Sequence, residues 1–331
     1  MDKVRIGIIG CGGMARYHGR MFTKFVPDAE IVALSEPNEA NLARFIKEVF
    51  TDPQDEPATF SDYRRMLEEV ELDGVVIVSP HNQHYQQAVD AIDHGCHVLV
   101  EKPMVINTED ALALIRHAEK NSKVVSVAFP GPFSQEFQYI RRLVESGELG
   151  EISLVSGHCC QQWIQNVAGT WRTDPVQSGG GNLYDSGAHM FNAMLYLSGL
   201  AVTDVFAYVN NKDQQVDIEA AVTLRFSNGA LGTATVSGDS TYFEQGIYLQ
   251  GTKGTIKTSI YGGSLDYWSG GSKVKYPCVP ETPLLQQNFV DCILGRAETP
   301  SPALLGLRQA RLMDAIYESA RTGRPVSVVA D

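Results

Sequence analysis

The stretch Val4-Arg5-Ile6-Gly7-Ile8-Ile9-Gly10-Cys11-Gly12-Gly13-Met14-Ala15 decides the fold of the N-terminal half. It begins as a short, β-branched, apolar run, which is typical of a buried strand. The turn that follows has the spacing G-x-G-x-x-A, and residues 14–26 continue with helical periodicity. A strand that enters a helix through such a turn is the context in which this motif binds a dinucleotide. Gly10 allows the tight turn, Gly12 admits the pyrophosphate, and Ala15 lets the helix pack closely on the sheet.

Strands and helices alternate up to about residue 128. Short apolar strands are expected at residues 4–9, 31–34, 74–78, 97–100 and 123–128, with helices between them. Wholly apolar strands that alternate with helices are typical of a parallel sheet covered on both faces. We therefore expect an α/β protein in which residues 1–127 form a Rossmann domain with a doubly wound parallel sheet.

Strand patterns dominate after about residue 130. Apolar and polar residues alternate along them, and Asn228-Gly229 has the composition of a hairpin turn. This predicts a C-terminal α+β domain, residues 128–331, with a large open and mainly antiparallel sheet. Helices are expected near residues 187–197, 284–294 and 303–321, and the last two could pack back on the first domain.

A carboxylate at the end of the second strand would complete a dinucleotide site. Glu36 stands there, in Val32-Ala33-Leu34-Ser35-Glu36-Pro37. It can accept hydrogen bonds from both ribose hydroxyls and would repel a 2′-phosphate. No Arg or Lys follows it before Arg44. The sequence therefore favours NAD over NADP.

Composition excludes several other functions. The chain has 331 residues, a formal net charge of −12 and a pI near 5.1, which argues against nucleic acid or an anionic membrane as a partner. No apolar stretch is long enough for a signal peptide or a membrane span, and the six cysteines include no CxxC pair. We therefore expect a cytoplasmic protein with free thiols. The histidines lack Cys, Asp or Glu partners at ligand spacing, so no metal site is predicted.

Four segments together resemble the Gfo/Idh/MocA family of oxidoreductases, nearly from end to end. They are residues 4–15, the turn Ser79-Pro80 with His84 after it, the run CHVLVEKP at 96–103, and residues 171–189 with GGGNLYDSGAH. The resemblance implies a Rossmann domain that binds NAD and a second domain whose open sheet joins subunits. An open sheet must be covered, so a homodimer or homotetramer is expected. The implied cofactor-binding residues are Gly10, Gly12, Gly13, Met14, Ala15, Glu36, Ser79, Pro80, His84, Glu101 and Lys102.

Three residues are the expected catalytic groups. Lys102 follows the fourth strand at the sheet edge where ligands bind, and the resemblance implies that it is catalytic. Asp185 and His189 are four residues apart, a spacing that on a helix places both on one face. We expect His189 to act as general acid/base on a substrate hydroxyl, Asp185 to orient the substrate and His189, and Lys102 to bind the same oxygen. The alternative is a structural Asp–His pair that caps a helix.

Substrate contacts are expected from the same groups and from the stretch before them. An aromatic face suits the C–H side of a sugar, and Arg suits its hydroxyls or a carboxylate, so Trp163, Trp171 and Arg172 join Lys102, Asp185 and His189 as expected substrate-binding residues. Core packing accounts equally well for the tryptophans. Glycines 179–181 would let the backbone approach a ligand closely.

Two departures from the family pattern concern substrate recognition. His81 stands where the family usually has Asn, and the segment Phe129-Pro130-Gly131-Pro132-Phe133 lacks the family's Arg. The substrate is therefore expected to be recognised differently from that of the best-known inositol and glucose enzymes.

The sequence favours an NAD-dependent oxidoreductase that transfers a hydride between nicotinamide and a secondary hydroxyl or carbonyl of a sugar, sugar acid or cyclitol. One alternative is an NAD-dependent glycosidase that acts by transient oxidation and elimination. Another is a non-catalytic NAD-binding sensor, which should tolerate the loss of Lys102 or His189.

Overall fold

The structure is a computed structural model that describes residues 3–52, 54, 56–275 and 282–329. The chain forms two compact units. The first unit contains Met1–Val105, Glu109–Ala128 and Pro283–Gly306, and the second contains Ile106–Thr108, Phe129–Thr282 and Leu307–Asp331. A boundary after residue 127 would assign residues 283–306 to the second domain, whereas the contacts place them with the first unit.

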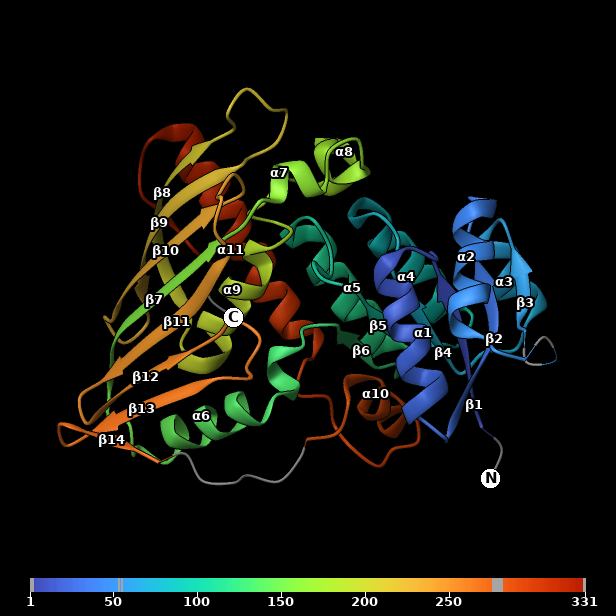
Figure 1. The fold of residues 1–331 in the computed structure, drawn as a ribbon, viewed down its shortest axis with the longest axis horizontal. Coiled ribbons are helices and arrows are strands. Elements are labelled where there is room, and N and C mark those ends of the chain that lie inside the picture. The colour runs from blue at the N-terminus through green and yellow to red at the C-terminus, as the bar shows by residue number, and fades with distance from the viewer. Residues whose placement is uncertain (1–2, 53, 55, 276–281, 330–331) are drawn as a thin grey trace. The chain divides into compact units, whose positions relative to one another are not determined.

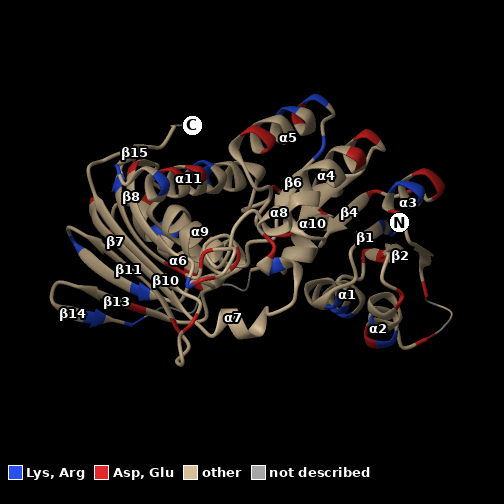
Figure 2. Ribbon diagram, turned by 90° about the horizontal axis from the view of Figure 1, so that it is seen from above, with Lys and Arg blue, Asp and Glu red and all other residues tan. Residues whose placement is uncertain are grey.

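The first unit is built on a six-stranded parallel sheet with the order β3-β2-β1-β4-β5-β6 (Figure 1). Its strands are β1 (Val4–Ile9), β2 (Ala29–Ser35), β3 (Ala58–Phe60), β4 (Gly74–Ile77), β5 (His97–Val100) and β6 (Val125–Val127). Its helices are α1 (Gly13–Phe25), α2 (Glu39–Val49), α3 (Tyr63–Glu69), α4 (His84–Asp93), α5 (Thr108–Lys120) and α10 (Leu285–Ile293). Figure 2 shows α1 and α2 on one side of the sheet and α3, α4 and α5 on the other. The doubly wound parallel sheet predicted from the alternating pattern is confirmed.

The core of the first unit explains why its strands are short and apolar. Ile6, Ile8, Val76 and Leu99 have no exposed surface, because helices cover both faces of the sheet. Ala15 is equally buried, so α1 lies close to the sheet. The strand order reverses between β1 and β4, and ligands bind at such a switch point in open α/β sheets.

The second unit is built on a nine-stranded sheet with the order β14-β13-β12-β11-β7-β10-β9-β8-β15. Its strands are β7 (Ile152–Cys160), β8 (Val202–Asn210), β9 (Glu219–Phe226), β10 (Leu231–Ser237), β11 (Glu244–Gly251), β12 (Gly254–Thr258), β13 (Leu265–Ser269), β14 (Ser272–Val274) and β15 (Val326–Ser327). The pair β7–β10 is parallel and the other neighbouring pairs are antiparallel, which confirms a mainly antiparallel sheet.

Helices cover one face of this second sheet (Figure 1). They are α6 (Gln135–Glu145), α9 (Gly187–Ser198) and α11 (Ala303–Thr322). Two short helices, α7 (Trp163–Asn166) and α8 (Pro175–Ser178), lie between β7 and α9 along the chain. The division between the units falls within α11, after Gly306. On the opposite face, Ala221, Thr223 and Arg225 of β9 are exposed while their neighbours along the strand are buried. The alternation expected from the sequence therefore gives a sheet with one face in solvent.

Candidate active site

The glycine turn between β1 and α1 has the geometry of a phosphate cradle. Gly10 adopts a φ of +87°, and a Cβ there would lie 2.8 Å from the carbonyl oxygen of Val78, so both the backbone angle and the close approach of β4 require glycine. A Cβ added at Gly12 or Gly13 would meet no described atom within 4 Å. Within the described chain no side chain caps α1, and its first turn carries no acid. Open space and uncapped amides at a helix N-terminus fit a pyrophosphate.

Glu36 faces this turn from the end of β2. Its Oε2 accepts a hydrogen bond from the Cys11 amide at 2.8 Å, and its Oε1 accepts one from the Asn38 amide at 2.9 Å. Glu36 is thus held beside the glycine turn, where a dinucleotide's ribose would lie. Arg44 is directed elsewhere, because its Nε donates to Glu48 at 2.7 Å. Glu36 therefore suits the ribose hydroxyls of NAD. Arg44 is paired with Glu48, so it does not offer its charge to the 2′-phosphate of NADP.

Ser79 and Pro80 form the turn after β4, and the side chain of His84 contacts the backbone of this turn. The His84 ring is fully buried, with Nε2 2.9 Å from the Ser79 carbonyl oxygen and Nδ1 2.8 Å from that of Pro103. Burial lowers the pKa of His84, although both carbonyl contacts oppose that shift. His84 therefore shapes the site through the backbone of two turns, and its ring has no surface for direct contact with a cofactor. His81, the departure from the family pattern, is also buried.

Lys102 follows β5 in a turn held by a buried polar chain. The Glu101 carboxylate accepts a hydrogen bond from the Lys102 amide at 3.1 Å, and its other oxygen lies 2.9 Å from Nε2 of His18 on α1. The Gln286 amide of α10 lies 2.8 Å from Nδ1 of the same ring. Glu101, only 7% exposed, thus connects the Lys102 turn to the helix that begins at the glycine turn.

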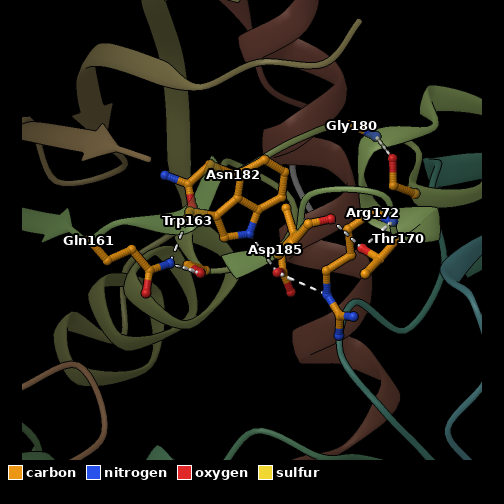
Figure 3. Close-up of polar contacts among 10 residues, drawn as sticks. Gln161, Trp163, Thr170, Arg172, Gly180, Asn182 and Asp185 are labelled. Atoms are coloured by element: carbon orange, nitrogen blue, oxygen red, sulfur yellow. Dashed lines mark hydrogen bonds and ion pairs between the residues drawn. The ribbon is translucent and has the colours of Figure 1, made fainter. Parts of the chain in front are cut away.

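In the second unit, Asp185 is anchored by two donors (Figure 3). Its Oδ2 accepts hydrogen bonds from the indole N–H of Trp163 at 2.8 Å and from Nε of Arg172 at 3.1 Å. The Asp185 side chain remains 13% exposed. Charge-assisted bonds from two directions hold the carboxylate in a defined orientation.

His189 lies in the first turn of α9, whereas Asp185 precedes the Ser186 N-cap. Their spacing had suggested that the two share a helix face. They do not, because the helix starts only at Gly187. The His189 ring packs edge-to-face on Tyr261, with centroids 4.7 Å apart. Burial, and to a lesser extent the nearby Cys159 and then Asp185, raises the pKa of Tyr261, so its hydroxyl stays protonated.

The two tryptophans have different surroundings. Trp163 is 2% exposed and packs with Val167, Val216 and Ile218, so it combines core packing with the bond to Asp185. Trp171 is partly exposed, and the Arg172 guanidinium lies 4.4 Å from the centre of its ring. The stacked Trp171–Arg172 pair is therefore the part of this stretch that can present an aromatic face.

Sequence reasoning missed several residues that lie near the candidate groups of each unit. His18, Tyr261 and Gln286 carry no local motif, and their contacts join segments that are far apart in the chain. Gln161 of β7's C-terminal extension is another, since its side-chain amide donates to the Ser186 hydroxyl at the start of α9. Only the position of His18, on the buried side of the helix after the glycine turn, was a usable signal.

Cys11, Cys96, Cys159, Cys160 and Cys292 are thiols, and Cys278 lies outside the described residues. Burial raises the pKa of Cys11 in the glycine turn to about 12, so its thiol stays neutral. Among the described residues, no three His, Cys, Asp or Glu side chains gather as metal ligands would. In the same ranges, none of the helices is both long and apolar enough to cross a bilayer.

Two family models match the chain. Residues 4–129 match the model of an oxidoreductase family with an NAD-binding Rossmann fold, and residues 137–257 match the GFO/IDH/MocA C-terminal domain. The chain is 29% identical to the uncharacterized oxidoreductase YrbE of Bacillus subtilis, over 98% of this chain and 97% of that protein. It is 25% identical to scyllo-inositol 2-dehydrogenase (NAD(+)) of the same organism, over 77% and 73% of the two chains.

The fold has close structural counterparts. The WlbA dehydrogenase of Bordetella pertussis, solved with NADH and UDP-GlcNAcA, superposes with a TM-score of 0.87 at 24% identity, covering 99% of this chain and 100% of that one. Since family models match most of both units, this chain belongs to the Gfo/Idh/MocA family of oxidoreductases, and its first unit is an NAD-binding Rossmann fold.

Proposed function

We propose that this protein catalyses the reversible, NAD-dependent oxidation of a secondary hydroxyl of a sugar, sugar acid or cyclitol. The observation that carries the proposal is the anchored but partly exposed carboxylate of Asp185, just before the helix that bears His189. A fixed carboxylate can orient a polyol through its hydroxyls, and an imidazole can accept a hydroxyl proton near neutral pH. The relative named scyllo-inositol 2-dehydrogenase supports a polyol as the substrate class.

The chemistry divides among the residues as follows. Bound NAD⁺ would supply the hydride acceptor for the oxidation, and nothing in this division of roles asks the protein's side chains to carry the hydride. His189 accepts the proton of the reacting hydroxyl, and in reverse it returns that proton to the carbonyl oxygen. Asp185 orients the substrate through neighbouring hydroxyls. Lys102 donates a hydrogen bond to the reacting oxygen and stabilises the negative charge that develops there.

The cofactor residues have a separate task. The amides after Gly12 would hold the pyrophosphate, and Glu36 would hold the adenosine ribose. His84 and Glu101 would keep the turns of Ser79 and Lys102 in place from within the core. Because none of these cofactor residues is His189, replacing His189 should lower turnover and leave NADH binding unchanged.

The test combines a substrate panel with variants. The purified protein is incubated with NAD⁺ and cyclitols, aldoses, sugar acids and aryl glycosides, while NADH absorbance and aglycone release are followed together. We expect NADH with one substrate group, and a fall in kcat of about 100- to 10,000-fold in His189→Ala with an unchanged Kd for NADH. His158→Ala, a half-exposed histidine on β7, is the matched control and should keep full activity.

The outcomes separate the alternative functions. Aglycone release without net NADH would assign the protein to the glycosidases that act by transient oxidation. Tight NADH binding without turnover, together with tolerance of His189→Ala, would identify a sensor. Normal turnover in His189→Ala would remove His189 from the mechanism.

We also propose that the exposed face of the second sheet joins two copies of this chain, in a homodimer or homotetramer. Large apolar side chains lie on this unit's surface, with Tyr208 69% and Leu231 55% exposed. An open sheet face with such residues is a common subunit contact. Light scattering after size exclusion should give a multimer, and Leu231→Lys should shift it toward the monomer.

A further inference from the structure

One buried carboxylate binds the backbone just before Asp185. Asp217 is 3% exposed, and its oxygens accept hydrogen bonds from the amides of Gly181 at 2.6 Å and Leu183 at 2.8 Å. The amide between these two, that of Asn182, donates to the Asp217 backbone carbonyl at 2.9 Å. The Tyr317 hydroxyl of α11 donates to the same carboxylate at 2.6 Å. Three consecutive amides and a phenol therefore converge on a single residue.

The glycines of this segment are required by these contacts. A Cβ at Gly181 would lie 2.0 Å from the Asp217 carbonyl oxygen, and one at Gly180 would lie 2.1 Å from the Tyr317 hydroxyl. The close approach that the sequence suggested for a ligand is thus made by Asp217 and Tyr317. Larger residues at either position would push the segment off its anchor.

Hydrogen bonds carry this anchoring to the candidate catalytic groups. The Asp185 amide donates to the Gly181 carbonyl at 3.0 Å, and the Gly187 amide donates to the Asn182 carbonyl at 2.8 Å. Gly187 begins α9, whose first turn bears His189. Asp217 therefore holds Gly181 and Asn182, and these two residues in turn bond the turn that contains Asp185 and the start of α9. Asn182 and Asp185 are labelled in Figure 3.

We infer that Asp217 and Tyr317 are positioning residues, which set the placement of Asp185 and His189 for the reaction without touching the substrate. A buried carboxylate is stable only when donors surround it, so removal of one donor changes how the segment is held. Small displacements of reacting groups lower turnover strongly. The inference rests on the proposed function for its kinetic part, and its structural part is measurable without any substrate.

The buried tyrosine stack supplies a matched pair of variants. Tyr317 and Tyr184 stack with ring centroids 6.0 Å apart, and among the described residues the Tyr184 hydroxyl has no hydrogen-bond partner. Tyr317→Phe and Tyr184→Phe each delete one buried hydroxyl from the same stack. We expect Tyr317→Phe to lower kcat about 10-fold and Asp217→Asn about 100-fold, with an unchanged Kd for NADH. Tyr184→Phe should keep wild-type kcat and KM.

Hydrogen–deuterium exchange tests the anchoring itself. The peptide covering residues 179–189 should exchange faster in Tyr317→Phe and in Asp217→Asn than in the wild type and in Tyr184→Phe. Unchanged exchange would overturn the inference whether or not a substrate is known. Absence of turnover in the wild type, by contrast, would count against the proposed function alone.

A double-mutant cycle tests the route through Asp185. If Tyr317 acts by placing Asp185, then Tyr317→Phe should have little further effect on kcat in an Asp185→Asn background. Fully additive losses would refute the route through Asp185. Equal losses in Tyr317→Phe and Tyr184→Phe would show that the stack matters only for stability and would refute the positioning role.

Discussion

His84→Phe should weaken both the fold and the reaction, because one buried ring supports two turns of the first unit, those of Ser79 and Lys102. The substitution keeps a ring of similar size and removes both nitrogens, which lie 2.8 and 2.9 Å from the carbonyl oxygens of Pro103 and Ser79. Those carbonyls would then face an apolar ring in the core. His94→Phe is the control, because His94 is exposed at the end of the same helix and contacts one carbonyl.

The magnitude follows from the charge state of the ring. Burial lowers the pKa of His84 below its usual 6.5, so at neutral pH one nitrogen donates and the other does not. Loss of one buried hydrogen bond with an acceptor left unsatisfied costs about 1–3 kcal/mol. We expect the free energy of unfolding to fall by that amount. kcat/KM should fall about 10- to 100-fold, because the turns that carry Ser79 and Lys102 are no longer fixed.

The pH dependence provides a second signature. Below about pH 6.5 the unfolded chain takes up a proton at His84 that the folded protein accepts only at lower pH. Unfolding is therefore favoured on acidification, and stability is lost as the pH falls from 6.5 toward the folded pKa. His84→Phe lacks this linkage, so its unfolding free energy should decline less between pH 7 and 5, measured by urea denaturation. Equal stability at pH 8 and superimposable pH profiles would refute the reasoning.

Three further predictions concern the site and its support. Trp163→Phe and Arg172→Met each remove one donor from Asp185, so each should lower kcat about 10-fold at saturating NAD⁺ while the Kd for NADH stays constant; unchanged steady-state kinetics would contradict this. Glu36→Ala should raise the Kd for NADH about 10-fold in a fluorescence titration and reduce the ratio of the Kd for NADPH to the Kd for NADH. An unchanged ratio would count against Glu36 as the residue that selects NADH. Tyr184→Phe should raise the free energy of unfolding by about 1 kcal/mol, because it removes a buried hydroxyl without a described partner; a lower thermal midpoint would be the opposing result.

Local patterns predicted most elements of the fold. The expected strand at residues 74–78 is observed as Gly74–Ile77. The helix α2 begins after Asn38, a residue type that favours this position, and the Asn38 side chain accepts a hydrogen bond from the Asn41 amide at 3.0 Å. The edge strand β3, Ala58–Phe60, escaped prediction because it is short and largely exposed, so it has no apolar run. The parallel β7–β10 pair could not be predicted either, since strand order is set by contacts between distant segments.

Among the candidate site residues, too, some could be predicted from the sequence and others could not. The glycine turn, Glu36 and the Lys102 turn follow strands whose position is legible in the sequence, and the structure places each at a strand end of the first unit. The residues that support these groups could not be predicted. Asp217 binds the segment before Asp185, and His18 binds Glu101 beside Lys102, and both partners are distant along the chain. Their side chains form no motif, and only the folded chain brings donor and acceptor together.

The place of α10 in the first unit has a consequence for how the protein is made. Phe289 and Val290 belong to the core that contains β1 and α1, and the side chains of Phe289 and Ile293 lie against the backbone of Gly74. A ribosome therefore releases the strands of the cofactor domain long before the helix that completes their core. Until the segment after Pro283 emerges, the nascent domain presents an apolar surface. Chaperones and proteases thus have access to that surface while residues 129–282 are synthesised.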